Sequence, residues 1–291
     1  MIERLAKFLL LAPALLAQAP NAAHFHHIHL NSVNPAAAIA FYTSRFDCQK
    51  RPLAGADAVW AQKSWFLFHR VDAAPPSAIV SAIWHFGWGA EDMKEEYDRQ
   101  LDLGTKFDTP ITDISGLAHY TGFYFAYVAG PDRALIELNT AAYHRFGHLH
   151  LLSADPAAAA DWYAKHFGVR RMLQGGAPSH RVRFYRGAQV GPSESLMMDN
   201  VNIIIFPVEY ARTALAKDWD GREGFESTRG RVVDHIGFSV ANLQAALDTL
   251  RKDGVKPLGP VAAWEGGAKR VFLEGPDRIA IELVEAPPAP E

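Results

Sequence analysis

The sequence has almost no cysteine, since Cys48 is the single one among 291 residues. A disulfide within the chain needs two cysteines, so none can form, and a thiolate cluster for zinc is excluded as well. Stability must therefore come from core packing. We expect Cys48, near the end of a predicted helix, to be an inert packed side chain.

A strong charge of either sign is also missing. The chain has 29 Lys and Arg against 32 Asp and Glu, for a formal net charge of −3. No basic field is available to attract nucleic acid or anionic lipid, so nucleic-acid partners are not expected. With 49% hydrophobic and 21% charged residues, the composition is that of a globular protein. The length allows one large domain or two ordinary ones.

Long hydrophobic runs are absent, and the longest apolar stretch, residues 8–17, is too short to span a bilayer as a helix. Basic residues precede it and Ala-Gln-Ala at 17–19 follows it, a pattern typical of a bacterial export signal. We predict a signal peptide over residues 1–23, cleaved after Ala19, Ala22 or Ala23. An amphipathic N-terminal helix is the alternative. The signal predicts a periplasmic or secreted protein with no membrane attachment once it is removed.

What the chain does have is an internal repeat. Gly-Pro-Asp-Arg-Ala-Leu-Ile-Glu-Leu at 130–138 recurs as Gly-Pro-Asp-Arg-Ile-Ala-Ile-Glu-Leu at 275–283, and His-Ile-His-Leu at 27–30 recurs as His-Leu-His-Leu at 148–151. An alanine-rich predicted helix follows each His pair, at 35–46 and 156–167. The distance from the first His to the first helix aromatic is the same in both, 27 to 41 and 148 to 162. These coincidences in one order indicate two related domains.

A smaller unit repeats within each half: a strand with a histidine, a helix, then antiparallel strands. The first half has a strand at 83–89, a helix at 93–103 and strands near 106–111, 119–128 and 134–139. The second half has a strand at 233–240, a helix at 243–253 and strands near 269–273 and 279–284. Gly-Pro-Asp-Arg between the last two strands of each half is a turn sequence. We place the domains at 24–142 and 146–286.

Histidines and glutamates fall at matching places in these strands. Because side chains alternate across a strand, His27 and His29 share a face, and so do His148 and His150. Glu137 and Glu282 each lie between apolar residues that face the other way, and a carboxylate buried there needs a cation, a metal or solvent. His85 and His235 also lie in apolar strands.

Two imidazoles and one carboxylate on neighbouring strands form a facial triad suited to a divalent metal with open coordination positions. The plainer interpretation, hydrogen-bonded core histidines and a glutamate in a wet cleft, would suit any one residue alone. Two sets in matching order favour metal sites.

These features resemble the vicinal oxygen chelate superfamily, which includes glyoxalase I, bleomycin- and fosfomycin-resistance proteins, epimerases and extradiol dioxygenases. The resemblance rests on the His-x-x-Leu starts with Phe41-Tyr42 or Trp162-Tyr163 downstream, on Asp-His-Ile-Gly-Phe-Ser-Val at 234–240, and on the two Gly-Pro-Asp-Arg endings. It covers nearly everything after the signal. It implies an α+β fold, with four β-α-β-β-β modules paired into two domains whose curled mixed sheets surround metal clefts.

Carried over residue by residue, the resemblance implies two ligand sets. They are His27, His85 and Glu137 in the first domain, and His148, His235 and Glu282 in the second. His29 and His150 remain alternative or supporting ligands. A fourth ligand, usual in glyoxalase-like members, could only be His69 or Asn202. That indicates three-ligand sites, closer to extradiol dioxygenases.

Those dioxygenases place a Tyr and a His beside the metal. Between His85 and Glu137 lie His119, Tyr120, Tyr124 and Tyr127, and we predict catalytic roles for His119 and Tyr124; plain core packing of the aromatics is the alternative. Trp60, Trp65, Trp84 and Trp88 would either line an apolar cleft for an aromatic substrate or belong to the core.

The predicted function is that of an exported metal-dependent enzyme, with Fe, Mn, Zn or Ni as cofactor. It would act on a small molecule that chelates the metal through adjacent oxygens, by isomerase, lyase or ring-cleaving dioxygenase chemistry. One rival is a non-catalytic binding protein that sequesters a small molecule, and another is a protein whose triads only stabilise the domains. Either a monomer or a homodimer is compatible with the tandem chain.

Overall fold

The computed structural model describes residues 22–76, 78–118, 121–172, 181–220, 223–264 and 267–288. Nearly all of the predicted signal peptide therefore lies outside the described residues. Within the described part, no helix is long and apolar enough to cross a membrane.

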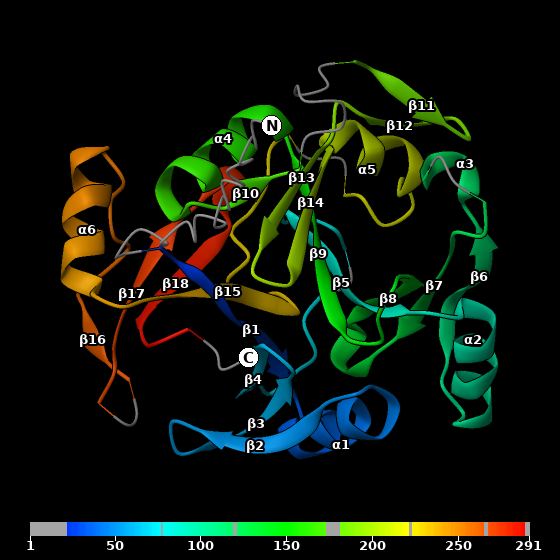
Figure 1. Ribbon diagram of the computed structural model, residues 1–291, viewed down its shortest axis with the longest axis horizontal. Helices are drawn as coiled ribbons and strands as arrows, with labels where there is room; N and C mark the ends of the chain where they lie inside the picture. Colours follow the sequence, from blue (N-terminus) through cyan, green and yellow to red (C-terminus); the bar gives the residue numbers. More distant parts are fainter. Residues whose placement is uncertain are drawn as a thin grey trace, which may run out of the picture.

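Most of the described strands form two eight-stranded sheets (Figure 1). We call the first the terminal sheet, because its strands come from the two ends of the chain. Its order is β16 (Ala262–Ala263), β17 (Lys269–Glu274), β18 (Ala280–Glu285), β15 (Val233–Val240), β1 (His24–Ser32), β4 (Ser64–Arg70), β3 (Ala56–Ala61) and β2 (Gln49–Leu53).

The second, which we call the middle sheet, comes from the middle of the chain. Its order is β10 (Arg170–Arg171), β13 (Glu194–Met198), β14 (Val201–Pro207), β9 (Phe146–Ser153), β5 (Ile83–Ala90), β8 (Leu135–Thr140), β7 (Tyr124–Ala129) and β6 (Phe107–Asp113). A separate hairpin joins β11 (Arg183–Tyr185) to β12 (Ala188–Gly191). The helices are α1 (Pro35–Arg45), α2 (Met93–Asp102), α3 (Ser115–Ala118), α4 (Pro156–Phe167), α5 (Val208–Ala214) and α6 (Leu243–Lys252).

Four modules with one topology make up these sheets, as the sequence predicts. In each, the first strand pairs in parallel with the last: β1 with β4, β5 with β8, β9 with β14 and β15 with β18. A helix follows each first strand, and its start is encoded locally. Asn34 and Asp155 accept hydrogen bonds from backbone N–H groups of α1 and α4, and a proline occupies the first turn of both. The α+β class and the modules are confirmed.

The pairing of the modules differs from the prediction. β1 pairs antiparallel with β15, and β5 pairs antiparallel with β9. The first module therefore shares a sheet with the fourth, and the second with the third. The prediction that residues 24–142 and 146–286 each enclose their own ligand set is wrong, because every sheet draws strands from both ranges. Local pattern specifies a strand, but the choice of its partner edge is made in three dimensions.

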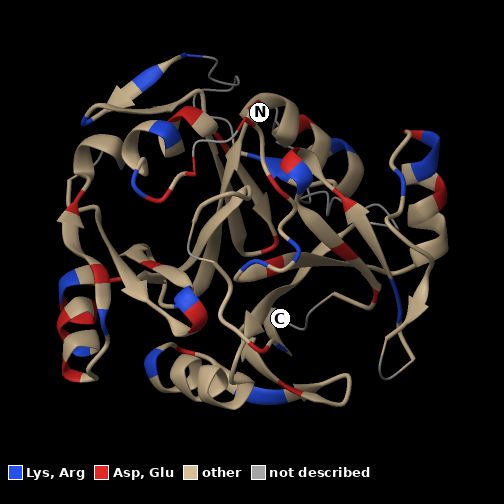
Figure 2. Cartoon of the chain, turned by 180° about the vertical axis from the view of Figure 1, so that it is seen from behind, with Lys and Arg blue, Asp and Glu red and all other residues tan. Residues whose placement is uncertain are grey.

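Both sheets bury one face in a common core. Phe146 of β9 has its ring centroid 6.0 Å from that of Phe25 in β1 and 5.0 Å from that of Phe66 in β4. Tyr42 of α1 and Tyr163 of α4, the equivalent helix aromatics, are almost fully buried. Outside this core, Figure 2 shows basic and acidic residues interspersed along the chain, with both signs on α2.

The repeated Gly-Pro-Asp-Arg turns connect the modules across the two sheets. Each forms a short 3-10 turn, η1 (Pro131–Arg133) or η3 (Pro276–Arg278), with its aspartate at φ 53°. Asp132 accepts a hydrogen bond from Val33 N–H, just after β1, and Asp277 accepts one from Ala154 N–H, just after β9. The turns thus fasten the first module to the second and the third to the fourth.

Candidate metal centres

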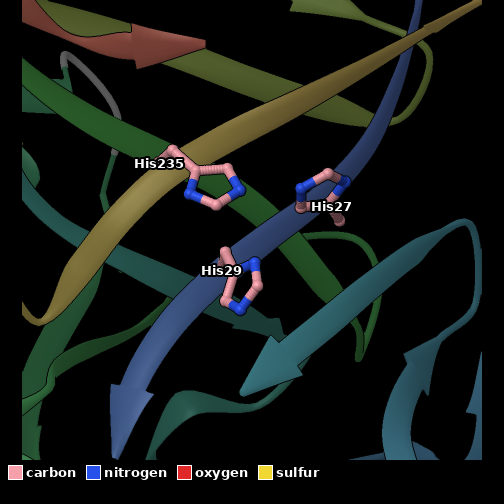
Figure 3. A group of neighbouring side chains, drawn as sticks. All are labelled: His27, His29 and His235. Atoms are coloured by element: carbon pink, nitrogen blue, oxygen red, sulfur yellow. The ribbon is translucent and has the colours of Figure 1, made fainter. Parts of the chain in front are cut away.

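The terminal sheet brings together two histidines and a glutamate from three adjacent strands, which we call the terminal site. His27 lies on β1, His235 on β15 and Glu282 on β18, and all three are buried. Glu282 Oε2 lies 3.2 Å from His27 Nε2 and 3.5 Å from His235 Nε2. His29, two residues along β1, faces the same way (Figure 3), and the nitrogens of the three histidines lie within 4.8 Å of one another.

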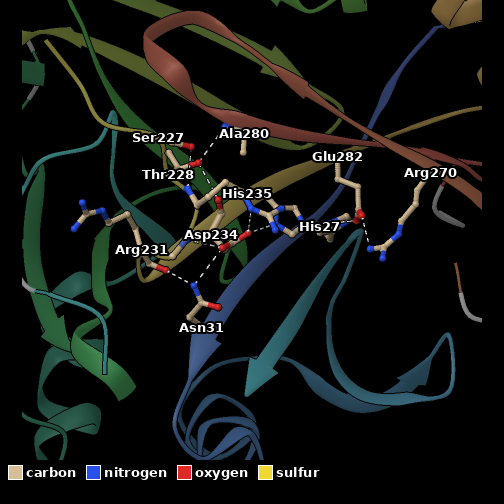
Figure 4. A network of polar contacts seen from close by, with 12 residues as sticks. His27, Asn31, Ser227, Thr228, Arg231, Asp234, His235, Arg270, Ala280 and Glu282 are labelled. Carbon is tan, nitrogen blue, oxygen red and sulfur yellow. Dashed lines mark hydrogen bonds and ion pairs between the residues drawn. The ribbon is translucent and has the colours of Figure 1, made fainter. Parts of the chain in front are cut away.

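Surrounding polar groups orient these ligands. Asp234 Oδ1 lies 2.6 Å from His235 Nδ1, so the carboxylate accepts the Nδ1–H and leaves the Nε2 lone pair directed into the site (Figure 4). Gly230 N–H and Asn31 donate in turn to Asp234. Arg270 Nη1 donates to Glu282 Oε1 over 2.7 Å, which leaves Oε2 facing the histidines.

The middle sheet repeats the arrangement in what we call the middle site. His85 lies on β5, Glu137 on β8 and His148 on β9, and all are buried. Glu137 Oε2 lies 2.9 Å from His85 Nε2, and Oε1 lies 3.7 Å from His148 Nε2. The three ligand atoms lie within 4.8 Å of one another. Asn139 Nδ2 donates to Glu137 Oε1 over 2.8 Å.

These sites contain buried polar atoms without hydrogen-bond partners. In the terminal site they are His27 Nε2, His235 Nε2, Glu282 Oε2 and His29 Nδ1; in the middle site they include His85 Nε2 and His148 Nε2. Burying polar atoms unsatisfied costs about 1–3 kcal/mol each. A hydrogen-bonded core histidine would not show this, so the orphaned, converging atoms fit a divalent metal ion at each site.

The protonation states agree with ligation. Burial lowers the pKa of His29 to about 2, of His85 to about 3 and of His148 to about 4, so these imidazoles are neutral at physiological pH. Burial also lowers the pKa of His27. For Glu282, burial acts to raise the pKa, but the neighbouring His235 and His27 outweigh it and hold the pKa below its ordinary value. Neutral imidazoles and an ionised carboxylate are the forms that bind metal.

Two glycines make room for the histidine rings, a feature that the sequence prediction missed. A Cβ on Gly237 of β15 would lie 1.9 Å from His27 Cε1, and one on Gly87 of β5 would lie 2.2 Å from His148 Cε1. Each glycine lies directly opposite that histidine across the antiparallel pair. The repeated His-x-Gly of β5 and β15 was the available signal. In each strand this glycine marks the position where the histidine ring of the neighbouring strand lies.

All six predicted ligands therefore lie in two buried clusters, but in exchanged sets. The predicted sets joined His27 with His85, and His148 with His235; the structure joins His27 with His235, and His148 with His85. The cause is the module pairing, since ligands meet only across adjacent strands. His29 offers a further ligand nitrogen to the terminal site, and His150 lies beside the middle site, with its ring centroid 4.8 Å from that of His85.

Of the two predicted catalytic residues, only Tyr124 is among those that the structure describes. His119 lies outside the described residues, so its role stays a prediction. Tyr124 faces the other side of β7, with the Lys94 ammonium of α2 4.9 Å from its ring centroid. Tyr127, three residues further on, lies opposite Glu137 in the sheet, with its ring centroid 5.0 Å from that of His85. The regular β7–β8 register places Tyr127, and not Tyr124, opposite the glutamate, so the predicted catalytic role of Tyr124 stays a prediction.

The possible fourth ligands lie at the edges of the sites. The His69 ring centroid is 6.5 Å from that of His29. Asn202 Oδ1 accepts a hydrogen bond from Ser195. Of the four tryptophans, Trp88 is fully buried in the core, whereas the Trp84 ring centroid lies 4.3 Å from that of His85.

Comparison with known proteins gives a family match and a similar fold. Residues 145–283 match the family described as the Glyoxalase/Bleomycin resistance protein/Dioxygenase superfamily. This part of the chain is similar to that superfamily. The matched segment contains His148, His235 and Glu282, whereas His27, His85 and Glu137, which complete the two sites, lie before it. No curated protein matches the chain by sequence.

The likeness in fold to solved structures extends over most of the chain. Glyoxalase I from Zea mays superposes with a TM-score of 0.66 at 14% identity, covering 91% of this chain and 93% of the maize chain. A candidate dioxygenase from Bacillus subtilis superposes with a TM-score of 0.60 at 14% identity, covering 93% of this chain and 87% of that chain. At this identity the likeness concerns the fold, and it confirms the predicted two-domain vicinal oxygen chelate architecture.

Proposed function

We propose that this protein is an exported, metal-dependent enzyme that acts on a small substrate able to chelate the metal through two adjacent oxygens. The observation that carries the proposal is the pair of buried two-histidine, one-glutamate sets whose histidine Nε2 atoms converge without hydrogen-bond partners. Three protein ligands leave coordination positions for substrate oxygens. The similarity of residues 145–283 to the superfamily supports the same chemistry.

His27, His235 and Glu282 would hold one ion, and His85, His148 and Glu137 the other. A bound divalent ion supplies Lewis acidity, which polarises oxygens that coordinate it. The surrounding residues keep the donors in their binding forms: Asp234 fixes the His235 tautomer, and Arg270 fixes the rotation of the Glu282 carboxylate. Burial and Glu137 raise the pKa of Tyr127 well above its ordinary value, so this phenol can donate a hydrogen bond and stays protonated.

Isomerase, lyase and ring-cleaving dioxygenase chemistry are all open to such a site, and metal identity distinguishes them. We expect protein purified without oxygen and without chelators to contain up to two divalent ions per chain. Fe(II) or Mn(II) would support dioxygenation, and Zn(II) or Ni(II) would support isomerisation. Turnover is then measured on catechols and on thiol–aldehyde adducts.

Two outcomes would contradict the proposal. Absence of metal, with unchanged thermal stability in His27→Ala and His148→Ala, would exclude metal sites altogether. Bound metal and tight ligand binding without turnover would instead favour a non-catalytic sequestration protein. Export is tested separately by N-terminal sequencing of the periplasmic protein, which should begin after Ala19, Ala22 or Ala23.

A further inference from the structure

The two sites have the same types of candidate ligand, two histidines and one glutamate. The residues around these ligands differ. On β17, Phe272 lies opposite Glu282 and Arg270 lies opposite Val284. On β7, Tyr127 lies opposite Glu137 and Phe125 lies opposite Asn139. Arg270 and Phe125 are therefore equivalent positions of the repeat. The cation that contacts Glu282 corresponds to an apolar ring that lies against Tyr127 in the other site.

Arg270 adds positive charge to the terminal site and still leaves one oxygen of Glu282 free to bind a metal ion. Its Nη1 binds Glu282 Oε1, while Oε2 remains directed at His27 and His235 (Figure 4). The Arg270 side chain is 32% exposed and that of Glu282 is fully buried, so the guanidinium approaches the carboxylate from the solvent side. A guanidinium has five N–H donors. Because one of them binds Glu282, Arg270 has further donors for an incoming ligand.

A second guanidinium lies close by. Arg229 Nε is 3.2 Å from Asp234 Oδ1, and the Arg229 guanidinium lies over the Phe272 ring at 4.3 Å from its centroid. The two carboxylates around the terminal site, Glu282 and Asp234, are thus each paired with an arginine, and their charges balance. Glu137 of the middle site contacts uncharged groups instead: His85, His148 and Asn139.

This difference in charge has opposite effects on cations and anions. A positive charge next to a ligand carboxylate repels a metal ion, and the interaction is strong where water is excluded. The same charge attracts an anion that coordinates the metal, and planar guanidinium edges match carboxylate oxygens. The terminal site should therefore favour metal and anion together over metal alone.

We propose that the terminal site binds its metal ion cooperatively with a negatively charged chelating ligand that Arg270 contacts, whereas the middle site binds metal alone. This rests on the proposed metal function and adds to it a substrate class, an anion such as a carboxylate with a second oxygen beside the first. Arg270 is the specificity-determining residue, and the terminal site is the one that takes the anionic substrate.

The test uses full-length chains with one site removed at a time. The double variant His85→Ala, His148→Ala keeps the terminal site, and His27→Ala, His235→Ala keeps the middle site. Zn²⁺ affinity is measured at buffered free Zn²⁺, with and without oxalate, a dianion with adjacent oxygens. We expect oxalate to tighten Zn²⁺ binding at the terminal site by about tenfold or more, and to leave the middle site unchanged.

Exchanging the repeat-equivalent residues supplies the matched controls. Arg270→Gln keeps a donor for Glu282 but removes the charge, so Zn²⁺ alone should bind more tightly and the oxalate effect should disappear. Phe125→Arg in the middle-site protein should weaken binding of Zn²⁺ alone. Thermal unfolding without metal checks that each variant is folded.

The experiment distinguishes failure of the proposed metal function from failure of the proposed role of Arg270. If Zn²⁺ binds neither site in folded protein, the proposed function is overturned, and this inference with it. If Zn²⁺ binds both sites and the oxalate effect is absent, or persists in Arg270→Gln, only the role of Arg270 is overturned.

Discussion

At the scale of single residues, the ligand sets depend on which side chains meet across β1–β15 and β5–β9. His27 and His235 belong to one site although more than two hundred positions of sequence separate them, and His27 and His85 belong to different sites. The number of metal ions bound per chain therefore tests this assignment. A site that has already lost one of its ligands should bind no less metal when it loses a second.

We therefore expect His27→Ala, His235→Ala to lose one bound metal ion per chain and retain the other. In contrast, His27→Ala, His85→Ala should lose both. Metal analysis by mass spectrometry on protein loaded with Zn²⁺ and freed of excess metal measures this. The reverse result, with one ion retained in the second variant and none in the first, would restore the ligand sets predicted from sequence.

Gly237 provides a finer test at the same scale. An alanine Cβ there would overlap the His27 ring, and only that ring is found among the nearest atoms. Gly237→Ala should thus displace His27, abolish metal binding at the terminal site and leave the middle site loaded. Overpacking of this kind costs about 1–3 kcal/mol in stability.

The matched control is Gly259→Ala, since a Cβ at Gly259 meets nothing within 4 Å. Zn²⁺ titration of both variants gives the comparison. Full occupancy of two ions in folded Gly237→Ala would show that this glycine does not reserve space for the ligand.

At the scale of elements, a buried carboxylate joins α2 to α1. Glu96 Oε1 accepts hydrogen bonds from Arg99 and Gln100, and both of these side chains also donate to the carbonyl oxygen of Arg45 at the end of α1. His144 Nε2 lies 3.6 Å from Glu96 Oε2. An amide in place of the Glu96 carboxylate keeps one acceptor oxygen, removes the charge and places an NH2 donor against a donor of Arg99.

Glu96→Gln should therefore lower the free energy of unfolding by about 1–3 kcal/mol near neutral pH. Burial acts to raise the pKa of Glu96, but its hydrogen bonds with His144, Arg99 and Gln100 lower it to about 2 from an ordinary 4.5. Its contribution is thus complete above pH 4.5 and is lost as the pH falls towards 2. The hydrogen bond with Glu96 raises the pKa of His144 from an ordinary 6.5, so that contribution is complete below pH 6.5 and is lost as the pH rises.

The difference in stability between the wild type and Glu96→Gln should consequently be largest between pH 4.5 and 6.5. Urea unfolding across pH 2.5 to 8 measures it, with exposed Glu95→Gln on the same helix as the control. A difference that is constant over this range would mean that ionisation of Glu96 and His144 does not contribute.

At the scale of the whole molecule, neither half of the chain contains a complete site. The terminal site takes His27 from the first half and His235 and Glu282 from the second; the middle site takes His85 and Glu137 from the first and His148 from the second. The short connection between β8 and β9, residues 141–145, is the place where the chain can be divided.

Dividing the chain there should yield halves that bind metal only when they are combined. Residues 22–142 and 143–288 produced together should form a one-to-one complex, because β1 pairs with β15 and β5 with β9. Size-exclusion chromatography with metal analysis measures both properties. Three-ligand zinc binding by each half alone, as a folded monomer, would contradict the interleaved architecture.

The sequence alone determined the modules, the turns, the helix starts and the six residues that we predict as ligands. These features depend on local rules: side-chain alternation, capping, turn chemistry and the self-similarity of the chain. Only the tertiary structure decided which modules share a sheet, and with them the grouping of the candidate ligands, the space that Gly237 and Gly87 leave for histidine rings, and the position of Tyr127 opposite Glu137. Strand edges are chemically alike along the backbone, so the selection of a partner comes from packing of both sheets on one core, which sequence order does not encode.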